Sequence, residues 1–157
     1  MRNFKKGFTL IELLVVIGIL TVLLTAVLIA INPIRQFGQA RDTQKHNDVL
    51  TILNAVQQNM ADNKGAFTKG GSAYALPTSA TDIASGGTAD ICSAISTTYV
   101  SVLPVDPGGG SPTGGAKDCT VAYDTKYTIM QDATTHRITV AATPDANGTG
   151  DPISVTR

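Results

Sequence analysis

Residues 13–31 read LLVVIGILTVLLTAVLIAI, an apolar run interrupted only by one glycine and two threonines. No charged residue lies between Glu12 and Arg35. At about 1.5 Å per residue, this uncharged stretch would span roughly 33 Å as a helix, and the hydrocarbon core of a bilayer is about 30 Å thick. The rest of the 157-residue chain has too little apolar mass to bury such a helix on every side. The run is therefore predicted to form a membrane-spanning helix.

The remainder of the chain has a different composition. Most of the 15 glycines lie at or after Gly65, in a region that is also rich in Ser, Thr, Ala and Asp. The 12 basic and 12 acidic side chains give a formal net charge of zero, so nothing indicates the basic surface that nucleic-acid binding requires. The sequence thus predicts an apolar N-terminal segment joined to a polar, loop-rich domain.

Three basic residues, Arg2, Lys5 and Lys6, precede the apolar run. A basic segment of this kind is also typical of a secretory signal peptide. The run is longer than the apolar region of such peptides, and residues 28–30 (LIA) match a small-x-small cleavage site poorly. Ordinary signal-peptide cleavage is therefore the less favoured interpretation.

Glu12 is the only glutamate in the chain, and it lies inside the apolar stretch. An ionised carboxylate is costly in a bilayer and generally faces a partner there. One interpretation places the Glu12 carboxylate at the membrane interface, near the end of the helix. The other requires a cation at the same depth in the membrane.

Residues 6–15, KGFTLIELLV, resemble the leader junction of type IV prepilins and of type II secretion pseudopilins. The shared motif is a short basic leader, a Gly-Phe junction, the residues TLIE and a long apolar run, and the close resemblance covers roughly residues 1–60. It implies that a prepilin peptidase cleaves between Gly7 and Phe8, and that the new amino group of Phe8 is then methylated. It also implies that Glu12 pairs with the Phe8 amine of a neighbouring subunit, which gives a partner to two otherwise expensive charges.

The function implied by this resemblance is structural. The chain would be a subunit of a type IV pilus-like or type II secretion pseudopilus filament, a helical homo-oligomer. Its partners would be the prepilin peptidase, an inner-membrane assembly platform and a cytoplasmic assembly ATPase. The precursor would cross the cytoplasmic membrane once, with its head outside the cytoplasm, and the filament would lie at the cell surface or in the periplasm.

The alternative is a single-span, membrane-anchored extracytoplasmic protein that binds a ligand with its head. That protein would need no leader cleavage, and Glu12 would have no partner. An enzyme is not expected, because the sequence contains no catalytic constellation. The N-terminal motif does not distinguish a pilus from a competence pilus or a secretion pseudopilus.

A second helical segment follows the apolar run. Asn32-Pro33 predicts a kink, since proline removes one hydrogen bond of a helix. Apolar residues at positions 34, 37, 49, 52, 53, 56 and 60 keep a helical spacing to about residue 63, with Gly65 as a candidate C′ residue. Between them, Arg35, Arg41 and Lys45 are expected to form a solvated helix face, or to contact lipid head groups or another subunit.

The C-terminal region is expected to form a small antiparallel sheet that covers the apolar stripe of this helix. A short helical turn is expected near residues 91–95, and a hairpin turn at Asp132–Thr135. The fold class is therefore α+β and pilin-like: a long N-terminal helix packed on a sheet head. The expected strands cover residues 99–103, 121–123, 126–131, 137–142 and 153–155. The expected organisation is a leader (1–7), a transmembrane or filament-core helix (8–31), an amphipathic helix (32–64) and a loop-rich head (65–157).

Cys92 and Cys119 are the only cysteines. If the head lies outside the cytoplasm, as the leader resemblance implies, an oxidised pair is expected. Closing a loop of about 28 residues would contribute roughly 3.5 kcal/mol in the chain-entropy model. The alternative is two reduced thiols in a reducing setting.

Asp106, Asp118, Asp124 and Asp132 are candidates for a calcium site, because some pseudopilins have a calcium loop in this region. No EF-hand spacing is present, so solvated aspartates are the favoured interpretation. No other metal and no cofactor is expected.

Overall fold

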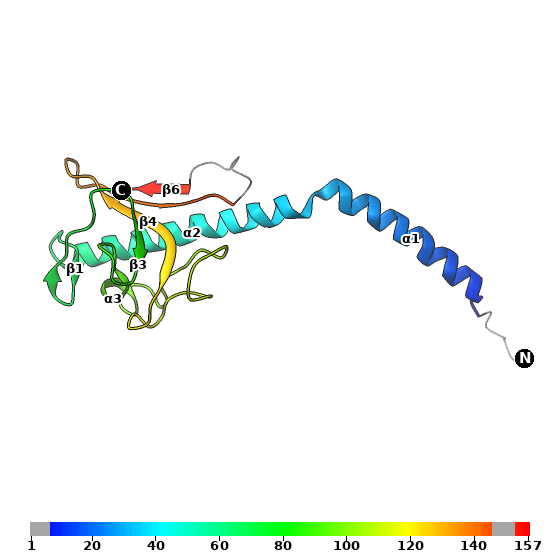
Figure 1. Ribbon diagram of the computed structural model, residues 1–157, viewed down its shortest axis with the longest axis horizontal. Helices are drawn as coiled ribbons and strands as arrows, with labels where there is room; N and C mark the ends of the chain where they lie inside the picture. The colour runs from blue at the N-terminus through cyan, green and yellow to red at the C-terminus, as the bar shows by residue number, and fades with distance from the viewer. Residues whose placement is uncertain (1–6, 146–152) are drawn as a thin grey trace, which may run out of the picture. The chain divides into compact units, whose positions relative to one another are not determined.

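The computed structural model describes residues 7–145 and 153–157, and the chain divides into two compact units, Met1–Phe37 and Gly38–Arg157. Figure 1 shows the elements in chain order. They are α1 (Leu10–Ile31), α2 (Pro33–Asp62), β1 (Thr68–Lys69), β2 (Ser72–Ala73), β3 (Thr81–Ala84), α3 (Cys92–Ile95), β4 (Asp124–Gln131), β5 (Ile138–Ala142) and β6 (Ile153–Thr156).

The two long helices are separated by a single residue, Asn32. Its backbone lies in the left-handed region (φ 46°), a conformation that asparagine tolerates better than most residues. Pro33 then begins α2, where its missing N–H costs nothing and its fixed φ suits the first helical turn. The kink predicted near Pro33 is thus a one-residue interruption, and the helix predicted from residue 8 starts at Leu10.

One face of α2 forms the centre of the head. Val49, Ile52, Leu53 and Val56 are completely buried, as their helical spacing predicts. After the helix ends, the Gly65 N–H donates to the Met60 carbonyl oxygen at 2.8 Å, with Gly65 in the left-handed region (φ 89°). The predicted helix stop is confirmed, but Gly65 is the C″ residue, since α2 ends at Asp62 and the C′ residue is Lys64, which is also left-handed (φ 58°).

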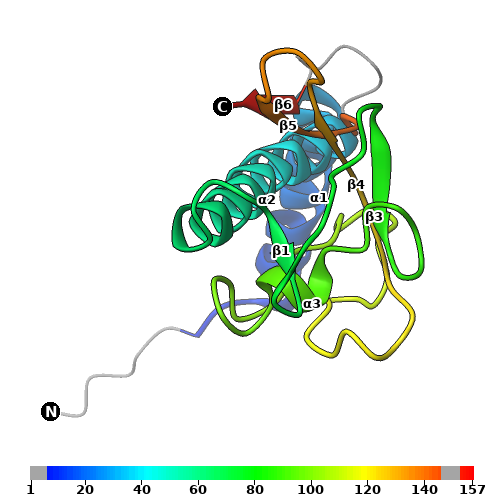
Figure 2. The ribbon, with the colours of Figure 1, turned by 90° about the vertical axis from the view of Figure 1, so that its left-hand side faces the viewer.

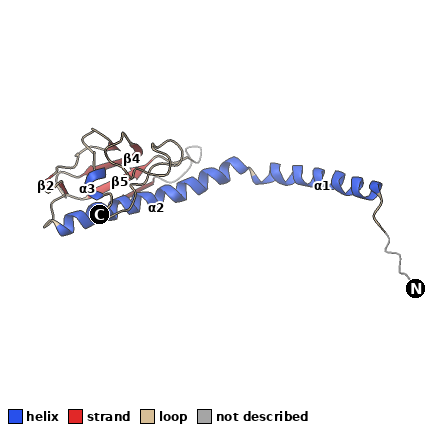
Figure 3. Ribbon diagram, turned by 90° about the horizontal axis from the view of Figure 1, so that it is seen from below, coloured by secondary structure: helices blue, strands red, loops and turns tan. Residues whose placement is uncertain are grey.

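The sheet covers that face of α2. Its strand order is β3-β4-β5-β6, and every neighbouring pair is antiparallel. Figures 2 and 3 show these strands on one side of α2, so the head consists of two layers. The predicted hairpin turn joins β4 to β5, and the Asp132 carboxylate accepts hydrogen bonds there from the backbone N–H groups of Thr134 and Thr135. A separate two-stranded hairpin, β1-β2, follows α2.

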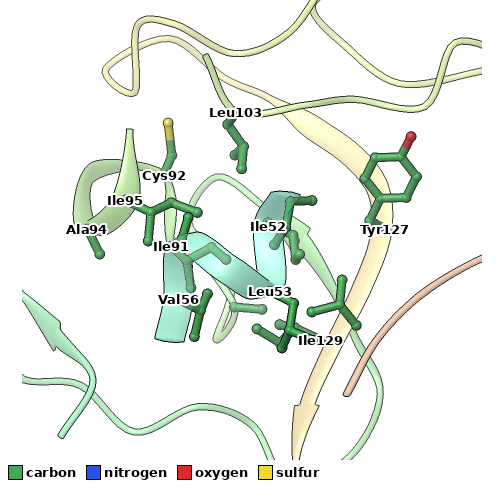
Figure 4. Packing of buried hydrophobic residues seen from close by; sticks show 14 of the residues in the cluster. Ile52, Leu53, Val56, Ile91, Cys92, Ala94, Ile95, Leu103, Tyr127 and Ile129 are labelled. Carbon is green, nitrogen blue, oxygen red and sulfur yellow. The ribbon is translucent and has the colours of Figure 1, made fainter. Parts of the chain in front are cut away.

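The core combines residues of the helices, the loops and the sheet. Figure 4 shows side chains of α2 at the centre of the cluster, between those of α3 and Ile129 of β4, with the buried Leu103 at its edge. The buried amide of Asn59 ties these parts together, because its nitrogen donates to the carbonyl oxygens of Thr68 (3.0 Å) and Ala94 (3.1 Å). An otherwise costly buried polar group therefore links α2 to β1 and α3.

Two of the predicted strands do not form. Residues 99–103 form no strand, because the chain turns tightly after α3 through Thr97 (φ 67°), and only isolated bridges join Val100 and Leu103 to other segments. Residues 121–123 likewise precede β4 and are not part of a strand. Conversely, β3 lies in a region predicted to be loop. Only one of its four residues, Ile83, is buried, so the sequence offered no clear alternation.

Candidate functional site

The start of α1 and the three residues before it form the candidate site. Residues 7–9 are not helical, and the Phe8 side chain is almost completely exposed. Gly7 does not adopt the left-handed backbone, and a Cβ at this position would meet no described atom within 4 Å. Neither packing nor backbone conformation therefore requires glycine here. The Gly7–Phe8 peptide bond is presented in an exposed, non-helical segment, as protease substrates generally are.

Glu12 takes part in a reciprocal cap at the first turn of α1. The Glu12 carboxylate oxygen Oε2 accepts hydrogen bonds from the backbone N–H and the hydroxyl of Thr9, both at 2.8 Å. The Glu12 N–H in turn donates to Thr9 Oγ1 at 3.3 Å. This is a capping box, which satisfies backbone donors that a helix start leaves free. It holds the carboxylate at the N-terminal end of the helix, where the helix dipole favours a negative charge.

The capping box leaves part of the Glu12 carboxylate unused. Among residues 7–145 and 153–157, none donates a hydrogen bond to Oε1 and none forms an ion pair with Glu12. The carboxylate is also exposed. It can therefore accept an additional cationic partner from outside this chain without losing its cap.

The surface of α1 is apolar along its length. Leu10–Ala30 is long and apolar enough to cross a membrane, and none of this segment is buried. Its two threonines do not offer free hydroxyls: Thr21 donates to the Ile17 carbonyl oxygen at 2.7 Å, and Thr25 to that of Thr21 at 2.9 Å. Both threonine hydroxyls are thus satisfied within the helix, which an apolar environment favours.

The comparisons with known proteins agree with this geometry. Residues 2–28 match the family model of the prokaryotic N-terminal methylation motif. The chain carries the N-terminal signature of type IV pilins and pseudopilins. Gly7, Phe8 and Glu12 all lie inside the matched segment of this pilin-type N-terminus, and the motif and the apolar helix together fit a membrane-anchored precursor. No significant match was found among curated proteins or among solved structures.

Behind the pilin-type N-terminus, the head contains a buried ion cluster that the sequence analysis did not predict. The Lys45 side chain is only 1% exposed, and its Nζ lies 2.9 Å from Asp106 Oδ2, 2.9 Å from Asp145 Oδ1 and 2.8 Å from the Thr143 carbonyl oxygen. Burial alone would lower the pKa of Lys45, but the hydrogen bonds and charges of the two aspartates outweigh it and raise the pKa. The cluster fastens two segments of the head to α2.

Lys45 was therefore wrongly expected to be solvated or to face lipid. A signal was available, because Lys45 lies four residues before Val49 and so falls on the buried face of the helix. Arg41 also has a partner within the head and pairs with Asp145. Burial raises the pKa of Asp145, but hydrogen bonds from Lys45 and Arg41 lower it more, so the net pKa lies below the usual range.

The structure does not gather the four calcium candidates into one site. Asp106 pairs with Lys45, and Asp124 pairs with Lys126. Asp118 accepts hydrogen bonds from Thr120, and Asp132 caps its own hairpin turn. In the described parts of the chain, no three His, Cys, Asp or Glu side chains lie together as metal ligands would.

Cys92 and Cys119 are joined by a disulfide bond, with their Cα atoms 5.6 Å apart. Cys92 is completely buried at the start of α3, and its N–H donates to the Tyr123 hydroxyl at 3.3 Å. The bond closes a loop that contains the glycine-rich segment 108–115. It ties this irregular part of the head to the core.

Proposed function

We propose that the chain is the precursor of a filament subunit of a type IV pilus-like or type II secretion pseudopilus system. The observation that carries the proposal is the start of α1: within the matched motif, an exposed Gly7–Phe8 bond precedes a capped helix whose apolar surface no described residue of the chain covers. Such a surface needs lipid before assembly and neighbouring helices afterwards. The helices of other copies provide those neighbours in a homo-oligomeric filament.

Processing is the first step of this function. A prepilin peptidase cleaves between Gly7 and Phe8, and the Phe8 amine is then methylated. Cleavage removes Arg2, Lys5 and Lys6, so that nine basic and 12 acidic side chains are left of the 12 and 12 in the precursor. It also creates a cationic amino terminus one residue before Thr9, next to the capping box.

Assembly uses that new charge. In the filament, the Glu12 carboxylate pairs with the Phe8 amine of a neighbouring subunit. The support from the geometry is that Thr9 occupies Oε2 and leaves Oε1 accessible. In an apolar bundle each of the two charges would be costly alone, so a subunit that is shifted along the bundle loses this contact and its stabilisation. The pair thereby sets the register of assembly.

The precursor is placed in the cytoplasmic membrane with its head outside the cytoplasm. The disulfide of the head supports this orientation, because such bonds persist in oxidising compartments. The assembly platform and the cytoplasmic ATPase act on the membrane-inserted subunit. The assembled filament then lies in the periplasm or at the cell surface.

Mass spectrometry of the N-terminus tests the processing step. We expect N-methylated Phe8 as the first residue when the chain is produced together with a prepilin peptidase. Gly7→Val should leave the precursor uncleaved, while Gly18→Val should be processed normally. These variants are matched, since an added Cβ meets no described atom within 4 Å at either position. An intact Met1 in the wild-type chain would instead favour the membrane-anchored binding protein.

The assembly step is tested with Glu12→Gln. Glutamine also serves in a capping box, so this variant keeps the cap of α1 and removes only the charge. We expect normal insertion and cleavage but few filaments in electron micrographs. Thr9→Ser retains both the cap and the charge and should assemble normally. Abundant filaments of Glu12→Gln would contradict the pairing.

A further inference from the structure

The first turn of α2 exposes two large apolar side chains. Ile34 is 75% exposed and Phe37 is 66% exposed. They are three residues apart, so they lie on the same side of the helix. Outside α1 and the residues before it, the only other large apolar side chain that is exposed in the described structure is Val121. This turn belongs to the same compact unit as α1, so its exposed residues follow directly on the apolar helix.

A cation accompanies the two apolar side chains. Arg35 lies between them in sequence, is exposed, and forms no hydrogen bond or ion pair with any described side chain. The next two basic residues along α2, Arg41 and Lys45, are both paired with carboxylates of the head. Among the described basic residues that follow α1, Arg35 is thus the nearest one whose charge is available to a partner.

We propose that residues 33–37 are an interfacial anchor that rests on anionic lipid head groups in the precursor. Ile34 and Phe37 lie at the level of the lipid head groups, and Arg35 contacts lipid phosphate. The inference rests on the proposed membrane insertion of α1, and it goes beyond it by assigning a lipid-binding role to the start of α2.

The position of the turn favours lipid over a protein partner. At about 1.5 Å per residue, Ile34 and Phe37 lie within roughly 9 Å of the end of α1, and each head-group layer is about 5–7 Å thick. A membrane-inserted α1 therefore delivers this turn to the interface without any other protein. Aromatic side chains are enriched at that depth, and a basic side chain beside an anionic surface is attracted to it. The composition of the turn matches both preferences.

Tryptophan fluorescence tests the anchor directly, because the natural chain contains no tryptophan. Phe37→Trp in the full-length precursor, reconstituted in vesicles of phosphatidylcholine and phosphatidylglycerol, introduces a single reporter. We expect its emission to be blue-shifted and to lose most of its intensity to lipids labelled near the head group. Aqueous iodide should quench it weakly.

Two controls separate this inference from membrane insertion itself. Leu23→Trp, in the middle of α1, should be quenched by lipids labelled deep in the acyl chains. Val121→Trp, on the exposed surface of the head, should be quenched by iodide alone. If iodide quenched the Phe37→Trp reporter while lipid labels still quenched Leu23→Trp, the anchor would be refuted and insertion would stand. If lipid labels failed to quench Leu23→Trp as well, both proposals would fail.

A second copy of the chain, rather than lipid, would also shield the Phe37→Trp reporter from iodide, and the same samples distinguish the two cases. If a second copy of the chain covered Phe37, neither iodide nor labelled lipid would quench Phe37→Trp, and dilution of the protein in lipid would expose it. That result would overturn the anchor.

The role of Arg35 is tested by Arg35→Gln in the Phe37→Trp background. The quenching data give the ratio of lipid-bound to water-exposed residues 33–37. With phosphatidylglycerol present, this ratio should fall about fivefold in the variant, and in pure phosphatidylcholine it should barely change. Arg137→Gln removes the same charge from the head and should have no effect in either lipid. An equal loss in both lipids would contradict the contact between Arg35 and phosphate.

Discussion

The two long helices use the same kinds of apolar side chain in opposite ways. Leu23 in α1 is 57% exposed, whereas Leu53 in α2 is completely buried against the sheet. The apolar side chains of α2 occupy one face, and the head covers that face within the same chain. Those of α1 surround the helix, and no described residue covers them. The apolar residues of α2 therefore stabilise the head, whereas those of α1 contribute no buried core in the described part of the chain.

Their polar residues differ in the same sense. Lys45 and Asn59 on the buried face of α2 find all their partners inside the head. Glu12 at the start of α1 is bonded, among the described residues, only within its own helix turn and keeps an accessible carboxylate oxygen. This contrast would be contradicted if a substitution in α1 changed the stability of the head, or if a buried polar group of α2 could be removed without loss of stability.

The largest expected effect is that of Lys45→Met. Methionine fills a similar volume but leaves the nearly buried Asp106 without its cation, and removing one partner of a buried pair costs about 3–5 kcal/mol. We expect this loss in the free energy of unfolding, measured by urea denaturation of the full-length chain in detergent micelles. Lys126→Met breaks an exposed ion pair and should change the midpoint little. Equal effects of the two variants would show that the Lys45 cluster does not hold the head together.

The second effect compares the two leucines directly. Leu53→Ala should destabilise the head by about 3 kcal/mol, because it removes buried contacts and leaves a cavity. Leu23→Ala changes the same atoms on the exposed surface of α1 and should leave the unfolding of the head unchanged. Circular dichroism in the same micelles measures both. If Leu23→Ala lowered the melting temperature of the head, α1 would contribute to folding and the contrast between the helices would be lost.

The third effect concerns the loop region of the head. Replacing Cys92 and Cys119 by serine opens a loop of about 28 residues and should lower the free energy of unfolding by roughly 3 kcal/mol. The buried position of Cys92 should also make the bond slow to reduce under native conditions. Thiol alkylation before and after denaturation checks both points. Quantitative labelling of the native wild-type protein without a reductant would show that the bond does not form.

The sequence predicted the parts of this molecule that depend on local pattern. The helical spacing of residues 49–60, the stop at Gly65 and the turn at Asp132 follow from residue type and spacing alone. The junction at Gly7 and Phe8 was visible as a motif. The partners of Lys45 were not predictable in this way, because Asp106 and Asp145 lie far from it in sequence and meet it only in the folded head.

The strands show the same limit. Leu103 is buried in the core and Tyr99 and Val100 pack against it, but burial alone does not make a strand. β3 is a strand because it pairs with the edge of β4, although its own four residues carry little sequence signal for a strand. Similarly, the exposure of Ile34 and Phe37 could not be read from the helical pattern, which places them on the same stripe as the buried residues of α2.

The smallest expected effect concerns two carboxylates, Asp48 on α2 and Asp90 in the loop before α3, which should change the stability of the head with pH in opposite directions. Burial raises the pKa of Asp48 on α2, partly offset by a hydrogen bond from the Tyr127 hydroxyl, and the nearby Asp106 charge raises it further. For Asp90, burial would also raise the pKa, but hydrogen bonds from the Tyr123 hydroxyl, Lys69 and the Gly86 N–H lower it below its usual range.

These shifts have opposite signs in the stability of the head. A raised carboxyl pKa in the folded state stabilises it below the unfolded pKa of about 3.9, and the gain is lost as pH rises through the folded pKa. A lowered pKa stabilises the folded state above that value, and the gain is lost as pH falls through the folded pKa. Relative to wild type, Asp48→Asn should therefore become more stable from pH 3 to pH 7, and Asp90→Asn less stable. Because both carboxylates are partly exposed, each change should be about 1 kcal/mol or less. If urea denaturation showed the same direction of pH dependence for both variants, burial would not be the main influence on the pKa of Asp48. The buried face of α2 would then be more accessible to water than its contrast with α1 implies.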